Sequence, residues 1–150
     1  MKIQTGDIFS IKTNKGYGFI QYVENIEVFG EYVRILAPIK AEKNITQSEI
    51  DEMERWNIYF PLKIAHRRKI VDFIGKYELP SNYVAHENVR TEHNIRGEHL
   101  GWRIVNRKTL AAEFKKKLDE KDLKLSPHGI FNDTLIIEYL ESDWKLENWR

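Results

Sequence analysis

The chain has 150 residues, of which 41% are hydrophobic, and it contains no cysteine. A chain of this length can bury a core without disulfides or a structural metal. The lack of cysteine excludes disulfides, thiolate nucleophiles and cysteine-based zinc sites. The 24 basic and 23 acidic side chains leave a formal charge of +1, which argues against a strongly basic nucleic-acid scaffold. Any function that depends on charge is therefore expected to be local.

The first third of the sequence has the two-residue period of β-strands. Residues 7–12 alternate between apolar and polar side chains, with Phe9 and Ile11 on one face. Turn residues then lead into a second expected strand over 17–23, and a third follows over 31–36. The pattern predicts an antiparallel hairpin extended by one strand.

The middle of the chain mixes helical and extended signals. Thr46 and Glu49 have the spacing of a capping box, which predicts a short helix after Thr46. Residues 59–64 are expected to be extended because of Pro61. A further strand is predicted over 69–74.

The last third is predicted to contain a loop, a strand and two helices. Residues 78–99 show no sustained period and are expected to form a long loop, followed by a strand over 100–105. Thr109 is the expected cap of a helix in which apolar residues recur every four positions, at Leu110, Phe114 and Leu118. A last short helix is predicted after Asn132.

No internal repeat or linker interrupts the sequence, so residues 1–150 are interpreted as a single domain. The predicted fold class is α+β, with a curved antiparallel sheet in the N-terminal and middle region, SH3-like or partly barrelled. Helices are expected mainly toward the C-terminal end. The tail, residues 144–149, begins and ends with tryptophan and is expected to be docked rather than loose.

Residues 15–20, Lys-Gly-Tyr-Gly-Phe-Ile, resemble the first ribonucleoprotein motif of cold-shock domains. In that family the motif implies a strand whose aromatic rings stack on unpaired bases. Tyr17 and Phe19 are equally consistent with the inward face of an ordinary strand. Binding of single-stranded nucleic acid is therefore the alternative hypothesis for function.

Three histidines, each beside a glutamate, stand between positions 86 and 99. Imidazole and carboxylate are both zinc ligands, but these spacings are not those of a helix-borne metal motif. No serine elbow, cysteine or distinctive carboxylate pair is present either. We therefore predict no metal, no cofactor and no enzymatic activity, and a metal-dependent enzyme is the minor alternative. The pairs are His86 with Glu87, His93 with Glu92, and His99 with Glu98.

Four segments of the chain form a pattern: the strand Gly6–Ile11, the glycine-containing strand Gly16–Tyr22, a short third strand, and the tryptophan-bearing segment Gly101–Ile104. This pattern resembles immunity protein family 26 of bacterial polymorphic-toxin systems. It covers about the first 105 residues. It implies a cytoplasmic protein that binds a cognate toxin domain and blocks it without catalysis.

If the resemblance holds, the side chains that bind the toxin are expected to be basic, aromatic or imidazole groups. The basic segment 66–69 and the loop 82–98 supply the candidates. The resemblance makes a protein the expected partner. No signal peptide or membrane span is predicted, so no membrane partner is expected, and the formal charge of +1 argues against nucleic acid. The candidate partner-binding residues are Arg67, Arg68, Lys69, Tyr83, His86, Arg90 and His93.

Overall fold

The computed structural model describes residues 2–150, which divide between two units. Unit 1 contains the N-terminal part of the chain through Tyr83 together with residues 129–144. Unit 2 contains residues 84–128 and 145–150. The chain therefore leaves unit 1, builds most of unit 2, returns to unit 1 and ends in unit 2. The single domain expected from the sequence stays a prediction.

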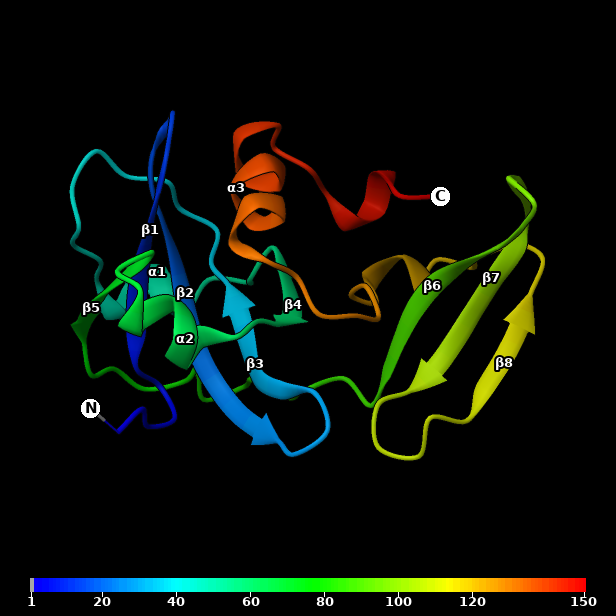
Figure 1. Cartoon of the computed structure of the whole chain (residues 1–150), viewed down its shortest axis with the longest axis horizontal. Helices are drawn as coiled ribbons and strands as arrows, with labels where there is room; N and C mark the ends of the chain where they lie inside the picture. Colours follow the sequence, from blue (N-terminus) through cyan, green and yellow to red (C-terminus); the bar gives the residue numbers. More distant parts are fainter. Residues whose placement is uncertain (1) are drawn as a thin grey trace. The chain divides into compact units, whose positions relative to one another are not determined.

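Unit 1 is built on a five-stranded antiparallel sheet with the strand order β4-β3-β2-β1-β5 (Figure 1). The first three strands form the predicted hairpin and its extension, because Phe9 pairs with Ile20 and Ile20 pairs with Ile35. The predicted strand over 69–74 is also confirmed, with its start two residues later. The strands are β1 (Ile8–Thr13), β2 (Gly16–Ile26), β3 (Gly30–Ile35), β4 (Trp56–Tyr59) and β5 (Val71–Gly75).

Three α-helices complete unit 1, and their starts follow from local chemistry. The predicted capping box is present, because the Thr46 hydroxyl accepts from the Glu49 amide while the Glu49 carboxylate accepts from the Thr46 amide. The Asn132 side chain likewise caps the last helix. The extended segment predicted around Pro61 is wrong from residue 62 onward, because the fixed φ of proline also suits the start of a helix. The helices are α1 (Gln47–Ile50), α2 (Leu62–Arg67) and α3 (Asp133–Glu141).

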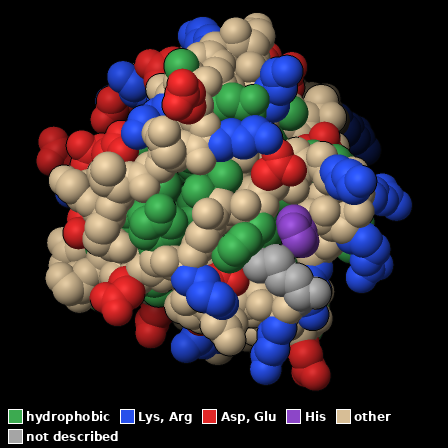
Figure 2. Space-filling model, turned by 90° about the vertical axis from the view of Figure 1, so that its left-hand side faces the viewer, with side chains coloured by type: hydrophobic (Ala, Val, Ile, Leu, Met, Phe, Trp, Pro, Cys, Tyr) green, Lys and Arg blue, Asp and Glu red, His purple; other side chains and the backbone are tan. Residues whose placement is uncertain are grey.

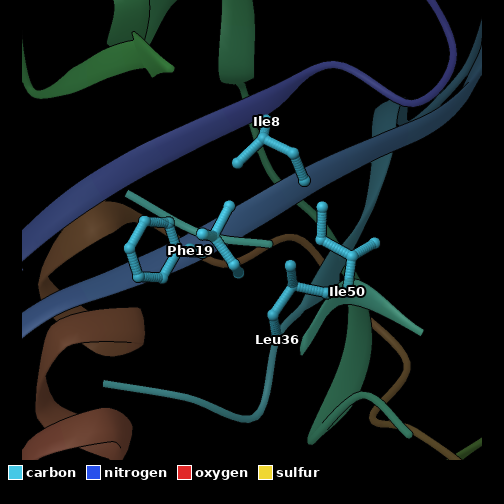
Figure 3. Packing of buried hydrophobic residues seen from close by; sticks show 5 residues of the cluster. Ile8, Phe19, Leu36 and Ile50 are labelled. Carbon is cyan, nitrogen blue, oxygen red and sulfur yellow. The ribbon is translucent and has the colours of Figure 1, made fainter. Parts of the chain in front are cut away.

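An apolar cluster fills unit 1 between its strands and α1. Figure 3 shows the side chains of Ile8, Phe19, Leu36 and Ile50 directed toward one another, and none of them is more than 1% exposed. Ile45 belongs to the same cluster. Burial of such side chains is the main favourable contribution to folding. The sequence pattern predicted a single apolar face for β1, with Phe9 on it, whereas Ile8 of this cluster lies on the opposite face and both side chains are fully buried.

Unit 2 is built on a three-stranded antiparallel sheet with the order β6-β7-β8. Along the outer edge of β6 the Arg90 amide donates to the Ser126 carbonyl, and the His128 amide donates to the Arg90 carbonyl. Two short 3₁₀ helices complete the unit. The elements are β6 (Asn88–Ile95), β7 (Glu98–Asn106), β8 (Ala112–Lys115), η1 (Asp122–Lys124) and η2 (Leu146–Asn148).

Two sequence predictions for unit 2 are wrong. The expected loop over 78–99 contains β6, and the expected helix after Thr109 contains β8 instead. The strand predicted over 100–105 is confirmed within β7. The α+β class is also confirmed, but of the three α-helices described only α3 lies toward the C-terminal end, where helices were mainly expected. Among residues 2–150 neither sheet closes into a barrel. No helix in this range is long and apolar enough to cross a membrane.

Candidate partner-binding surfaces

The seven predicted binding residues are divided between the two units. Arg67, Arg68, Lys69 and Tyr83 belong to unit 1, whereas His86, Arg90 and His93 belong to unit 2. They are therefore separate groups of side chains rather than one established site, and each group has its own geometry.

The basic turn, defined as Arg67, Arg68 and Lys69, ends α2 with three exposed cations. The Arg68 amide donates to the Ile64 carbonyl and the Lys69 amide donates to the His66 carbonyl, which fixes the turn. Among residues 2–150 no carboxylate forms an ion pair with these three side chains. The basic turn is thus a local concentration of uncompensated positive charge.

Lys69 holds the basic turn in a left-handed conformation, with φ at +60°. This conformation costs an L-residue about 1 kcal/mol, and glycine is the usual residue at such a helix end. A lysine therefore occupies a position where glycine would relieve backbone strain. On the face of the molecule shown in Figure 2, basic and acidic side chains are interspersed.

Tyr83 is a partly buried part of a polar network in unit 1. Its hydroxyl donates to Asn57 Oδ1 at 2.8 Å, and its ring centroid lies 5.4 Å from the guanidinium carbon of Arg34. Arg34 is fully buried and donates to the Glu54 carboxylate at 3.0 Å. The network therefore gives Tyr83 a structural role beside a buried ion pair. Arg34 also donates to Gln21 Oε1 and to the carbonyls of Ile50 and Glu52.

Arg90 was expected to be exposed and to bind a partner, but it is buried. It lies on β6 and is fully buried, with its guanidinium carbon 5.2 Å from the Trp102 ring centroid and 4.4 Å from that of Trp149. Burial lowers the pKa of Arg90 to about 10. With no surface to offer a partner, Arg90 is removed from the candidate binding residues. The guanidinium donates to the carbonyls of Leu123, Leu125, Leu146 and Trp149.

The two candidate histidines, His86 and His93, have different surroundings within unit 2. His86 is exposed, and its carbonyl accepts from Arg107 Nε at 2.7 Å. His93 lies on β6 with its ring centroid 5.4 Å from that of Phe114. His99 Nδ1 lies 2.9 Å from Asn94 Oδ1. No three histidine, aspartate or glutamate side chains of residues 2–150 come together as a metal-binding group.

One face of the unit 2 sheet gathers side chains that sequence reasoning missed. Thr91 pairs with Arg103, Arg103 pairs with Phe114, and His93 pairs with Gly101, so these residues share a face. A Cβ on Gly101 would lie 2.8 Å from the Phe114 ring, because the ring lies over this glycine. Phe114 nevertheless remains 55% exposed and Arg103 is exposed. The sequence placed Phe114 in the buried stripe of a helix, which concealed this surface.

The segment resembling a cold-shock motif belongs to the core of unit 1. Phe19 is fully buried in the apolar cluster, and Tyr17 packs partly buried against it. The two glycines allow close approaches, because a Cβ on Gly16 would lie 2.5 Å from the Lys40 carbonyl oxygen and one on Gly18 would lie 2.6 Å from Leu140 Cδ1. The Phe19 ring is thus not accessible for stacking on a base.

Comparison with protein-family models, with curated proteins and with solved structures finds no match for this chain. The resemblance to immunity protein family 26 therefore rests on the sequence motifs alone.

Proposed function

We propose that the chain is a non-catalytic, immunity-type protein of the cytoplasm that binds a cognate bacterial toxin domain and neutralises it. The resemblance of the N-terminal strands to the immunity family suggests the class of partner. The observation that carries the proposal is the basic turn, where three exposed cations have no carboxylate partner among residues 2–150.

The basic turn suits recognition of an acidic protein surface. Uncompensated charges on one partner raise the rate of association with an oppositely charged surface and disfavour partners of like charge. The backbone hydrogen bonds of Arg68 and Lys69 hold the turn in place, so little ordering of the backbone is needed when a partner binds. The toxin is therefore expected to present carboxylates to this turn, and its neutralisation follows from occlusion of a functional surface.

The experiment is co-expression with the toxin domain encoded beside this chain, followed by measurement of growth and of complex formation. We expect rescued growth and a complex that co-elutes in size-exclusion chromatography. The double variant Arg67→Glu/Arg68→Glu is expected to weaken the complex by about tenfold or more, with a larger loss at low salt.

The matched control is Lys12→Glu/Lys15→Glu, which makes the same change in net charge at two exposed lysines of unit 1. It is expected to change affinity by no more than about threefold. Absence of both rescue and complex would overturn the proposed function. Equal losses in the two double variants would show that overall charge, and not the basic turn, determines binding.

A further inference from the structure

The outer edge of β8 pairs with no other strand among residues 2–150. β8 is the last strand in the order β6-β7-β8, whereas residues 126–128 pair along the outer edge of β6. Successive residues of a strand direct their backbone groups to opposite sides, so about half of those in β8 are directed away from β7. Such an edge is a template for another extended chain.

Exposed apolar side chains and exposed lysines occur together in β8 and in the residues directly before and after it. Phe114 is 55% exposed and Leu110 is 49% exposed. Lys116 and Lys117 are exposed directly after the strand and form no ion pair with any residue of the described range 2–150, whereas Lys115 is bound to Asp122 at 2.8 Å. Residues 108–117 contain four lysines and one glutamate.

Protection against aggregation does not account for the whole pattern. Lysines near a strand edge do discourage pairing with other chains. Phe114 covers Gly101 of β7 but still leaves 55% of its surface exposed, and aromatic side chains are preferred anchors in protein interfaces. Lysine repels a second copy of the same basic edge, whereas it attracts an acidic chain.

We infer that β8 is a docking site for an extended, acidic segment of a protein partner, which adds to the sheet as a further strand. Main-chain hydrogen bonds to β8 would provide the alignment, an apolar side chain would pack on Phe114, and carboxylates would face Lys116 and Lys117. The inference depends on the proposed function only for the identity of the partner as a toxin. The edge itself is defined by its pairing, exposure and charge.

The test uses the full chain and a short fluorescent peptide of alternating glutamate and valine. We expect saturable binding in fluorescence anisotropy, with slower hydrogen exchange at the amides of β8. A peptide of identical composition that is N-methylated at alternate residues keeps its charge but loses donors on one side. Two such peptides are made, one methylated at the odd and one at the even positions. Only one of them loses the donors that face β8, and that peptide is expected to bind at least about tenfold more weakly than the unmodified peptide.

Two charge variants test the position of the site. Lys116→Glu/Lys117→Glu lies outside the β8 pairing and is expected to weaken peptide binding by about tenfold or more. The control Lys121→Glu/Lys124→Glu makes the same charge change at two exposed lysines around η1 and is expected to have little effect. Equal losses in both variants would overturn the inference.

The remaining outcomes separate this inference from the proposed function. The inference would be overturned if hydrogen exchange at β8 were unchanged by the peptide, or if both methylated peptides bound as tightly as the unmodified one. A concentration-dependent dimer of the chain that is lost in Lys116→Glu/Lys117→Glu would also overturn it. Peptide binding without toxin neutralisation would leave the β8 site standing and remove the immunity function. Toxin neutralisation without any peptide binding would do the reverse, removing the β8 site and leaving the immunity function.

Discussion

Each of the two units buries an arginine completely, but the two side chains are compensated in different ways. In unit 1, Arg34 lies against the Glu54 carboxylate at 3.0 Å and next to a large apolar cluster. In unit 2, Arg90 lies between two indole rings and donates to backbone carbonyls. Arg34 is thus part of a buried ion pair beside an apolar core, whereas Arg90 is held by aromatic rings and backbone carbonyls.

The difference reflects the size of the two sheets. A five-stranded sheet with three helices can enclose an apolar cluster, so Arg34 lies beside a core that apolar side chains already form. Unit 2 has three strands and irregular segments, and Arg90 links β6 to Leu125 on one side and to Leu146 on the other. Hydrogen bonds from a cation are stronger than neutral ones, which suits a small unit with little apolar surface to bury.

Breaking the ion pair in unit 1 is expected to have the largest effect on stability. Arg34→Met leaves the Glu54 carboxylate without its cation at a position where its side chain is 10% exposed. The expected loss is about 3–5 kcal/mol of unfolding free energy, measured by urea denaturation. The double variant Arg34→Met/Glu54→Gln should recover part of this loss, and no recovery would show that the ion pair is not the cause.

Arg90→Met is expected to cost about 2–3 kcal/mol, because several carbonyls lose a charged donor. Arg90→Lys keeps the charge without the planar fork and should recover less than half of the loss. Hydrogen exchange should show the loss of protection concentrated in β6 and β7. An equal loss of protection in β1 and β2 would instead show that the two units unfold together.

Removal of residues 145–150 is expected to cost about 1–2 kcal/mol, or a fall of about 3–6 °C in melting temperature. The deletion takes away the Trp149 ring and two of the carbonyls that accept from Arg90. Water can then reach the guanidinium, so the expected effect is smaller than that of Arg90→Met. An unchanged melting curve would show that the tail contributes no stability to unit 2.

The smallest effect is expected from pH. Burial, with a smaller contribution from Arg103, lowers the pKa of His128 below its ordinary value of 6.5. The unfolded chain then binds a proton at a higher pH than the folded chain, so stability falls as the pH drops through 6.5 and is unaffected well above it. Thermal denaturation between pH 7.5 and 5.5 should show a steeper decline for the natural chain than for His128→Gln. Parallel declines would contradict this origin.

The elements that could be predicted from sequence are those with a strong local signal. The alternation of Phe9 and Ile11 gives β1, the capping box at Thr46 gives α1, and Asn132 marks the start of α3. Each signal acts within a few residues, so no knowledge of distant contacts is needed.

The elements that were missed depend on distant partners. Arg90 is a charged residue in a polar stretch of sequence, which is typical of an exposed loop. Its burial depends on carbonyls from residues 123–149, which accept hydrogen bonds from its guanidinium. Leu110, Phe114 and Leu118 have helical spacing, but Phe114 pairs with Arg103 and covers Gly101. Tertiary pairing outweighs propensity in such short segments.

The candidate site was predicted in part, for the same reason. A run of cations at the basic turn indicates exposure by itself, and the structure has all three side chains exposed. The side chains of Tyr83 and Arg90 can form hydrogen bonds with a partner, but in the structure they form them within the protein. Tyr83 donates to Asn57, and Arg90 donates to backbone carbonyls. Residue type alone could not separate an outward-facing guanidinium from one that is buried.

The path of the chain between the units also constrains the order in which the protein can mature during synthesis. Residues 84–128 emerge before α3, so unit 1 lacks a helix while most of unit 2 is already made. Arg90 in turn waits for the Trp149 carbonyl, 59 residues further along the chain. Neither unit can reach its final state until nearly the whole described sequence is available, so stalled synthesis would leave both incomplete and exposed to proteases and aggregation.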